Sequence, residues 1–233
     1  MRAPSHSPVS EAVDPFAAAG LSGHPACRMA AATEGDARAA EILTPAELSR
    51  LERMKSPSRR AEMKGSFAMR RDLIAEMTGC SLGDVRLDTH ADGAPFLLRP
   101  AGWSVSLANK ENYTVVALAP APSAIGVDVE IVREISWRPA LSMTSSDAER
   151  AELEAASDEI ETDIRKFFRM WTLKEAVLKS TGLGFRAGPK AVETPMAILR
   201  APGSGTLEAF GDKFEFWTAD AGETIVSLVR KRT

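Results

Sequence analysis

The sequence predicts an α+β fold, in which helices and short antiparallel strands form separate groups. Strand-like runs bounded by Gly, Pro and Asp cluster after the helical segments instead of alternating with them one by one. In addition, Thr-Val-Val-Ala-Leu at 114–118 resembles Thr-Ile-Val-Ser-Leu at 224–228, a faint sign of duplication. With 233 residues and 44% hydrophobic side chains, the chain can bury a proper core.

Three regions are expected along the chain. Residues 1–25 are rich in Ala, Ser, Pro and Gly without periodicity, which is typical of a disordered tail. We expect residues 26–122 to form an N-terminal half and residues 123–233 a C-terminal half.

In the N-terminal half, the sequence predicts two helices and three strands. Thr44-Pro45-Ala46-Glu47 has an N-cap, a proline in the first turn and an acidic third residue. The helix that follows is interrupted at 56–58, and a longer helix runs from Arg59 to a stop at Gly79. Strands are expected at 27–32, 103–108 and 113–119.

In the C-terminal half, a strand at 124–132 precedes two helical segments. Residues 146–162 are acidic and rich in alanine, so we expect a solvent-facing helix there. Residues 164–180 form a second helix, which ends before Gly182-Leu183-Gly184. The chain then returns to strands, expected at 196–199, 207–210, 213–218 and 224–229.

The composition excludes several classes of protein. Lys and Arg number 29 against 32 Asp and Glu, a net charge of −3, so no global basic field argues for nucleic acid. Cys27 and Cys80 form neither a disulfide framework nor a metal-binding spacing, and there are only three histidines. The chemistry is therefore expected to rest on Asp, Glu and Lys. No apolar run is long enough for a membrane span and no signal-peptide layout is present, so we expect a cytoplasmic protein.

The first motif is Ile125-Gly-Val-Asp-Val-Glu130. On a strand, Asp128 and Glu130 project from the same face, while the alternating apolar residues indicate a buried opposite face. Two neighbouring acids repel each other unless a cation joins them. Gly126 permits a close backbone approach beside them. Taken alone, an Asp-x-Glu pair is more often an exposed strand with two hydrated carboxylates.

The second motif is Trp171-Thr-Leu-Lys-Glu-Ala-Val-Leu-Lys179. On a helix, Trp171, Glu175 and Lys179 lie along one stripe. The plainer interpretation is an amphipathic core helix with a Glu175–Lys179 pair that contributes about 0.2–0.5 kcal/mol. If the two motifs meet, three carboxylates converge beside Lys174 and Lys179. That set suits a hard divalent cation and a phosphorylated substrate.

A basic cluster opens the long helix of the N-terminal half. Arg59 and Arg60 are its centre, and the neighbouring cations are Lys55, Lys64, Arg70 and Arg71. Such a basic run usually forms a solvent-exposed helix face, but the guanidinium groups of arginines can also bind a phosphate through paired hydrogen bonds. The usual phosphate-binding loops, GxxxxGK[ST] and GxGxxG, do not occur.

The two motifs, separated by a gap of forty-odd residues, resemble the signature of 4′-phosphopantetheinyl transferases. The likeness is greater to the larger, pseudo-dimeric type that activates surfactin synthetase. Weaker similarity extends over residues 43–69, which resemble the helix region of that family, and over Gly93-Ala94-Pro95, which stands where the family has Gly-x-Pro.

The resemblance implies two similar halves, each with a mostly antiparallel sheet packed on helices, and an active site in the cleft between them. Coenzyme A would bind there with Mg²⁺. Asp128, Glu130 and Glu175 match the metal-binding carboxylates, and Lys174 and Lys179 match the motif lysines, of which Lys179 would contact the coenzyme phosphates. Glu175 could serve as metal ligand, as base or as both.

The implied reaction moves the phosphopantetheine arm onto a serine of an acyl or peptidyl carrier protein and releases adenosine 3′,5′-bisphosphate. Its catalytic residues would be Asp128, Glu175 and Lys179. Such carriers serve fatty acid, polyketide or nonribosomal peptide biosynthesis, and enzymes of this type act as monomers. A basic or apolar rim at Arg165, Lys166, Phe185 and Arg186 is the expected docking surface for the carrier.

Two positions depart from the family pattern. Ser106 is kept, but Leu107 stands where the family has a histidine that touches the 3′-phosphate of the coenzyme. The arginine expected before the helix glycine falls on Ala61, one position from Arg60. These departures favour an alternative, a catalytically weakened relative that binds a carrier protein or another partner. A third hypothesis, an unrelated Mg²⁺-dependent phosphohydrolase, requires a richer set of acids or histidines.

Overall fold

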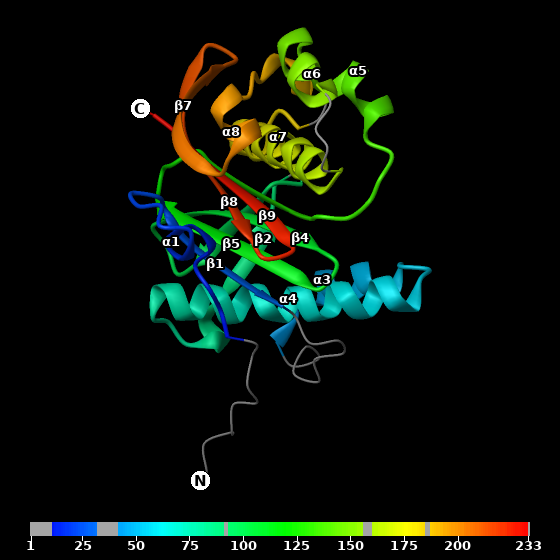
Figure 1. Ribbon diagram of the computed structural model, residues 1–233. Helices are drawn as coiled ribbons and strands as arrows, with labels where there is room; N and C mark the ends of the chain where they lie inside the picture. Colours follow the sequence, from blue (N-terminus) through cyan, green and yellow to red (C-terminus); the bar gives the residue numbers. More distant parts are fainter. Residues whose placement is uncertain (1–10, 32–41, 91–92, 156–159, 185–186, 233) are drawn as a thin grey trace.

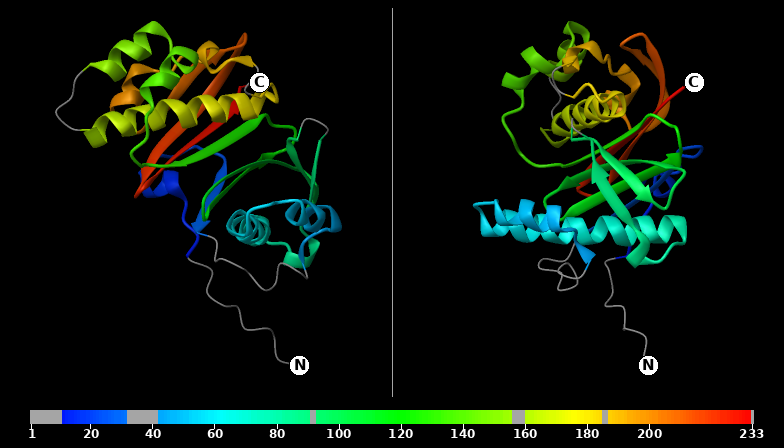
Figure 2. Two further views of the ribbon diagram at one scale, coloured as in Figure 1. Left: turned by 90° about the vertical axis from the view of Figure 1, so that its right-hand side faces the viewer. Right: turned by 180° about the vertical axis from the view of Figure 1, so that it is seen from behind.

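A computed structural model describes residues 11–31, 42–90, 93–155, 160–184 and 187–232. Two antiparallel sheets lie back to back, with the long helix α4 (Pro57–Thr78) outside one and the long helix α7 (Ile160–Thr181) outside the other (Figures 1 and 2). The α+β class expected from the sequence is therefore confirmed. In the described ranges, no helix combines the length and the apolarity needed to cross a membrane.

The first sheet, here called the N-terminal sheet, has the order β1-β5-β4. Its strands are β1 (Ala26–Ala31), β4 (Trp103–Lys110) and β5 (Tyr113–Pro120), which confirms the three strands predicted in this region. The short hairpin of β2 (Arg86–Thr89) and β3 (Pro95–Arg99) was not anticipated. Because Leu97 is the one residue of the hairpin strands that is buried, the sequence of the hairpin carries little strand periodicity.

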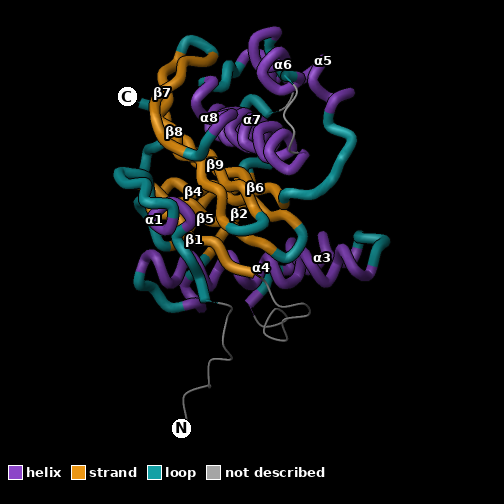
Figure 3. The backbone as a smooth tube through the Cα atoms, viewed as in Figure 1, coloured by secondary structure: helices purple, strands orange, loops and turns teal. Residues whose placement is uncertain are grey.

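The second sheet, here called the C-terminal sheet, has the order β6-β9-β8-β7 and is also antiparallel throughout. Its strands are β6 (Ile125–Ile131), β7 (Gly203–Ala209), β8 (Asp212–Ala221) and β9 (Thr224–Lys231). Figure 3 shows these strands between the helices of the upper part and the N-terminal sheet below. In the register of β6 and β9, Asp128 stands opposite Ser227.

Side-chain caps start the helices where the sequence predicts. Thr44 and Glu47 form a capping box at α3 (Pro45–Glu52), and Ser56 caps α4, which ends at the left-handed Gly79. Ser146 and Glu149 form a second capping box at α6 (Asp147–Glu154). The shorter helical elements are α1 (Pro15–Ala18), α5 (Leu141–Thr144), α8 (Met196–Arg200) and the 3₁₀ turns at Leu82–Asp84, Arg138–Ala140 and Pro189–Ala191.

Two predictions for the C-terminal region are wrong. Residues 196–199 form helix α8 and not a strand, because Met, Ala, Leu and Arg favour helix and the run buries only Ile198 and Leu199. The segment expected to be a solvent-facing helix at 146–162 forms α6, whose inner side buries Glu149 and Leu153 completely. Residues 156–159 lie outside the described part of the chain.

The tail expected at 1–25 also differs in part. Residues 1–10 lie outside the described part of the chain, but residues 11–25 pack against both sheets. Val13 bridges Met29 of β1, Phe16 of α1 is fully buried, and the indole N–H of Trp217 in β8 donates to the Ser22 carbonyl oxygen at 3.0 Å. Phe16 is thus part of the core, whereas most of the segment around it lies at the surface.

The largest apolar cluster fills the space between the two sheets. It joins Cys27, Val115 and Ala117 of the N-terminal sheet to Val127, Val129, Val226 and Leu228 of the C-terminal sheet. Separate clusters lie between α4 and the N-terminal sheet and between α7 and the C-terminal sheet. Each sheet is therefore covered on both faces, which explains why β5 and β9 are buried along most of their length.

Strand β6 touches helix α7 with its backbone at Gly126. A Cβ atom on Gly126 would lie 1.9 Å from the Ala176 carbonyl oxygen and 2.7 Å from the Ser180 amide nitrogen. No side chain fits in that space. The absence of a side chain at this position therefore sets the distance between the strand and the helix that carry the two sequence motifs.

We expect Gly126→Ala to destabilise the protein by about 3 kcal/mol, because both neighbours are backbone atoms and cannot move aside. Chemical denaturation measures the change. Gly203→Ala is the matched control, since its new methyl group would meet only the Ile198 Cδ1 atom at 3.4 Å. Equal stability of both variants would contradict the close contact.

A buried ion pair ties α3 to α4. Arg71 is 1% exposed and donates to both carboxylate oxygens of Glu47, at 2.6 and 3.1 Å. Burial pushes the pKa of Glu47 upward, but hydrogen bonds from Arg71 and Thr44 outweigh it, so the pKa lies below its ordinary 4.5. A carboxyl group with a lowered pKa stabilises the fold above its unfolded-state pKa, and this contribution is lost as the pH falls.

Glu47→Gln should therefore lower the free energy of unfolding by about 3 kcal/mol at pH 7, since the glutamine keeps the helix cap but leaves Arg71 without a counter-charge. The deficit should shrink as the pH falls below 4.5 and through the lowered pKa of Glu47, because the wild-type carboxyl then takes up a proton as well. Urea unfolding at pH 7 and over this acidic range tests this. Glu76→Gln, which removes an exposed partner of Arg28, is the control and should change little at either pH. A deficit that stays constant with pH would refute the assignment.

Candidate active site

Strand β6 presents its two acids to helix α7. Gly126, Asp128 and Glu130 share one face of the strand because side chains alternate, and Gly126 lies against α7. Val127 and Val129 on the opposite face belong to the core between the sheets. The prediction that Asp128 and Glu130 project together from a well-buried strand is thus confirmed.

Lys179 of α7 binds the first of these acids. Its ammonium nitrogen lies 2.7 Å from Asp128 Oδ1 and donates to the Val127 carbonyl oxygen at 3.0 Å. Asp128 is 8% exposed. Burial raises the pKa of Asp128 above its ordinary 3.8, although Lys179 opposes the shift. The two sequence motifs therefore meet through a direct ion pair.

The second acid has a partner from the other sheet. Lys110, the last residue of β4, places its ammonium nitrogen 2.6 Å from Glu130 Oε2. Sequence reasoning missed Lys110, because it lies outside both motifs. The proximity of β4 to β6 is a long-range contact that no local pattern indicates.

Glu175 lies beside this pair of acids on α7. Its Oε1 atom is buried and has no hydrogen-bond partner among the described residues. Burial is the largest cause that raises the pKa of Glu175 above its ordinary 4.5, and the nearby Asp128 carboxylate adds to the rise. A buried oxygen without a partner is costly, so Glu175 indicates a place for a cation or a proton.

The three carboxylates have the donor chemistry that Mg²⁺ prefers, and the unpartnered oxygen of Glu175 fits such an ion. In the arrangement of the described residues, however, no three Asp, Glu, His or Cys side chains lie close enough together to hold a metal. Asp128 and Glu130 are instead held by Lys179 and Lys110. The metal site predicted from the sequence therefore stays a prediction.

A pocket of about 310 Å³ opens beside Lys179, the partner of Asp128, although none of the three carboxylates is among its lining residues. One wall comes from the turn before β3 and from β4, and the other from the start of β6 and the end of α7. Ser106, Lys179 and the predicted Gly93-Ala94-Pro95 motif all line it, together with Val105, Leu107, Ile125, Leu178, Gly182 and Gly184. Ser106 Oγ also accepts a hydrogen bond from the Val127 amide at 2.9 Å, which ties β4 to β6.

Lys174 does not line this pocket. Its side chain is 0% exposed, and its ammonium donates to Glu149 at 2.9 Å, to the Pro189 carbonyl oxygen at 3.2 Å and to the Val192 carbonyl oxygen. Burial lowers the pKa of Lys174 despite the carboxylate beside it. Glu149 is equally buried and accepts from the Ser146 and Thr194 amides. The coenzyme-binding role predicted for Lys174 stays a prediction, and this geometry gives it no support, because all three of its donors are used inside the fold.

The predicted arginines stand apart from the pocket. Arg59 pairs with Glu62 at 3.0 Å, and Arg60 donates to the Met54 carbonyl oxygen at 2.7 Å, both at the solvent-exposed start of α4. Neither lines the pocket beside Lys179. Of the four residues expected to dock a carrier protein, Arg165 and Lys166 pair with Asp220 and Asp163, each at 3.4 Å. Phe185 and Arg186 lie outside the described residues.

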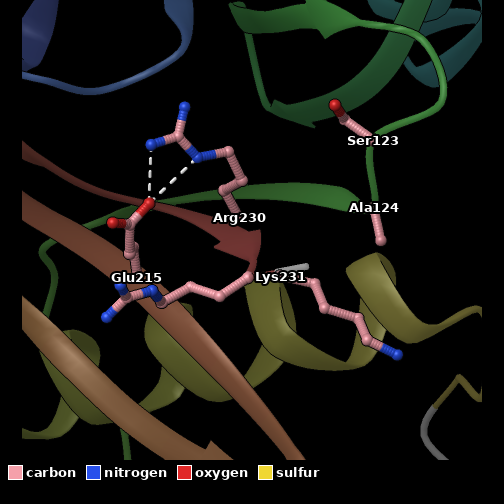
Figure 4. A pocket seen from close by; sticks show the side chains of 6 residues that line it. Ser123, Ala124, Glu215, Arg230 and Lys231 are labelled. Atoms are coloured by element: carbon pink, nitrogen blue, oxygen red, sulfur yellow. Dashed lines mark hydrogen bonds and ion pairs between the residues drawn. The ribbon is translucent and has the colours of Figure 1, made fainter.

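A larger pocket of about 460 Å³ lies at the other side of the start of β6. Figure 4 shows its basic lining, where Arg230 points to Glu215. Arg230 Nη2 is 2.6 Å from Glu215, and Lys231 pairs with Asp212 at 2.7 Å. Two of its cations are already neutralised and it contains none of the predicted site residues, so the smaller pocket beside Lys179 is the better candidate.

Comparison with known proteins identifies the family. Residues 124–225, which include β6 and α7, match the model of the 4′-phosphopantetheinyl transferase superfamily. The chain is 30% identical over 183 residues to the 4′-phosphopantetheinyl transferase HetI of Nostoc sp., a match that covers 74% of this chain and 76% of HetI. It is 27% identical over 137 residues to the 4′-phosphopantetheinyl transferase psf-1 of Bacillus pumilus, covering 57% of each protein.

The chain therefore belongs to the 4′-phosphopantetheinyl transferase superfamily, a class of group-transfer enzymes. The resemblance noted in the sequence and the enzyme class expected from it are confirmed.

The two motif lysines should respond differently to mutation. Lys174→Met leaves Glu149 buried without its counter-charge and should cost about 3–5 kcal/mol of stability. Lys179→Met also removes the counter-charge of a carboxylate, but the lysine is 34% exposed and water can compensate in part, so we expect a clearly smaller loss than for Lys174→Met. Urea unfolding of the two variants provides the comparison. Equal losses would contradict the separate roles assigned to these lysines.

Proposed function

We propose that this protein transfers the 4′-phosphopantetheine arm of coenzyme A to a serine of an acyl or peptidyl carrier protein and releases adenosine 3′,5′-bisphosphate. The observation that carries the proposal is the convergence of the two signature motifs at one pocket, where Lys179 lines the wall and holds Asp128. Family membership supports the same chemistry.

The site lies between two parts that we infer to be related halves. Each part has an antiparallel sheet with a long helix on its outer face. The similar segments 114–118 and 224–228 lie in β5 and β9, which are both inner strands of their sheets. The pocket takes its walls from both parts, in agreement with an active site in a cleft between the halves.

Coenzyme A would enter the pocket beside Lys179. Among the described residues that line this pocket, Lys179 carries the positive charge, so it suits the pyrophosphate of the coenzyme. Gly93, Ala94 and Pro95 on the opposite wall offer an apolar surface with room for a flat ring. Ser106 has its oxygen occupied by the Val127 amide, but its hydroxyl hydrogen remains a donor for a phosphate.

An adjoining smaller pocket compensates for the departures from the family pattern. It shares Pro95 and Leu107 with the first pocket and contains Arg50 and Arg70. Both guanidinium groups lie over the ring of Phe67, at 5.9 and 4.4 Å from its centroid. Burial lowers the pKa of Arg70 to about 10, so it stays charged at neutral pH. These arginines can supply the positive charge that Leu107 and Ala61 do not.

Asp128, Glu130 and Glu175 are the residues that would hold Mg²⁺. When bound, the ion neutralises pyrophosphate charge and orients the phosphate for in-line attack. Asp128 and Glu130 are each paired with a lysine in this structure, so Mg²⁺ would share or replace these partners.

The protein's own groups account for the rest of the reaction. The raised pKa of Glu175 suits a group that accepts the proton of the carrier serine, directly or through a water molecule. Lys179, 2.7 Å from Asp128, is placed to stabilise the negative charge on the departing bisphosphate. Asp128 keeps Lys179 oriented toward the pocket.

We further propose that the enzyme acts as a monomer in the cytoplasm on carrier proteins of fatty acid, polyketide or nonribosomal peptide biosynthesis. The alternative of a weakened relative rests on Leu107 and Ala61. The arginines beside Leu107 and the named transferases among the relatives favour the enzyme.

Mg²⁺-dependent incorporation of labelled phosphopantetheine into a panel of carrier proteins tests the proposal. Asp128→Ala and Glu175→Gln should each reduce the rate by about 100-fold or more, because each removes a charge at the reacting phosphate. Asp212→Asn, which removes an exposed acid at the other pocket, is the control and should retain the wild-type rate. Absence of incorporation into every carrier at saturating coenzyme A would refute the assignment.

A further inference from the structure

Strand β4 reaches the carboxylate site with its last residue. Ser106, Ala108 and Lys110 share one side of β4, since side chains alternate. Ser106 accepts the Val127 amide hydrogen, and Ala108 belongs to the core between the sheets. Lys110 is therefore directed at β6, where its ammonium nitrogen lies 2.6 Å from Glu130 Oε2.

The pair is partly shielded from water. The side chain of Lys110 is 26% exposed and that of Glu130 is 15% exposed. Glu130 is also close enough to Asp128 and Glu175 to raise the pKa of both. Lys110 thus neutralises a carboxylate in a group of acids that repel one another.

The Lys110 ammonium already occupies Glu130 Oε2, so a divalent cation that binds this oxygen must displace it, and one that binds the other carboxylate oxygen is repelled by its charge. We propose that Lys110 competes with the divalent cation for Glu130: it holds this carboxylate in the metal-free protein and releases it when the metal binds. The inference rests on the metal site assigned under the proposed function, and it adds a positioning residue from the N-terminal sheet that lies outside both signature motifs.

A purely structural ion pair makes a different prediction. It would stabilise the fold equally with and without metal, because it would persist in both states. Competition instead links the two equilibria, so the loss of Lys110 should weaken the metal-free protein only and tighten metal binding. The two interpretations are therefore separable without any measurement of activity.

Calorimetric titration of the full chain with Mg²⁺, and with Mn²⁺ as a second probe, tests the inference. Lys110→Met should lower the dissociation constant about fivefold, the equivalent of losing one partly exposed ion pair. Lys110→Arg keeps the charge and should bind like the wild type. Lys231→Met is the matched control, because it breaks an ion pair of 2.7 Å with Asp212 at the other pocket; it should leave the affinity unchanged.

Thermal unfolding gives the second readout. In EDTA, Lys110→Met should unfold at a lower temperature than the wild type, and saturating Mg²⁺ should abolish the difference. If the methionine variant does not fold, Lys110→Gln, which keeps a neutral hydrogen-bond donor for Glu130, answers the same question.

The outcomes separate the two proposals. If the wild type binds metal and Lys110→Met binds it with the same or lower affinity, the competition is refuted while the metal site stands. If neither the wild type nor any variant binds Mg²⁺ or Mn²⁺, the metal site is refuted and the competition with it. If Lys110→Met lowers the unfolding temperature by the same amount in EDTA and in Mg²⁺, Lys110 has a structural role and the inference is overturned.

Discussion

The contact between the backbone of β6 at Gly126 and helix α7 is the constraint on which the site depends. It brings the strand so near the helix that Asp128 meets Lys179 directly, and it leaves Glu175 beside the same acids. The opposite face of β6 packs into the core between the sheets. The strand is therefore held from both sides, and its carboxylates are placed by packing and not by a flexible loop.

Helix α7 shows how one motif serves two purposes. Lys174 faces inward to the buried Glu149 and joins the helix to the capping residue of α6. Lys179 faces β6 and the pocket, where it remains partly exposed. The first lysine has its donors used inside the fold, whereas the second can exchange its partner. Burial, more than residue type, separates the structural charge of Lys174 from that of Lys179, to which we assign a role in the proposed reaction.

The sequence predicted those features that depend on local patterns. The cap at Thr44, the stop at Gly79 and the alternation in β6 each depend only on neighbouring residues, and the structure agrees. Features that depend on distant partners were not predictable. Phe16 looks like part of a tail until its contacts in the core are known, and Lys110 carries no sign that β6 lies beside it. The strand predicted at residues 196–199 was wrong because a short apolar run fits a helix as well as a strand. On an α-helix, the side chains of adjacent residues point about 100° apart, so Lys174 and Glu175 cannot share a face. This geometry already argued against placing Lys174 in the same site as Glu175.

The segment before β1 has a consequence for handling and evolution of this protein. Phe16 fills part of the space between the sheets, and the Ser22 carbonyl oxygen accepts a hydrogen bond from the indole N–H of Trp217. Residues 11–25, here called the clasp, therefore connect β1 and β8. Proteolytic cleavage inside this clasp would expose an apolar surface and leave the indole nitrogen without its acceptor. A shortened gene product that began at β1 would thus be prone to self-association, whereas a purification tag placed ahead of the clasp would leave it intact.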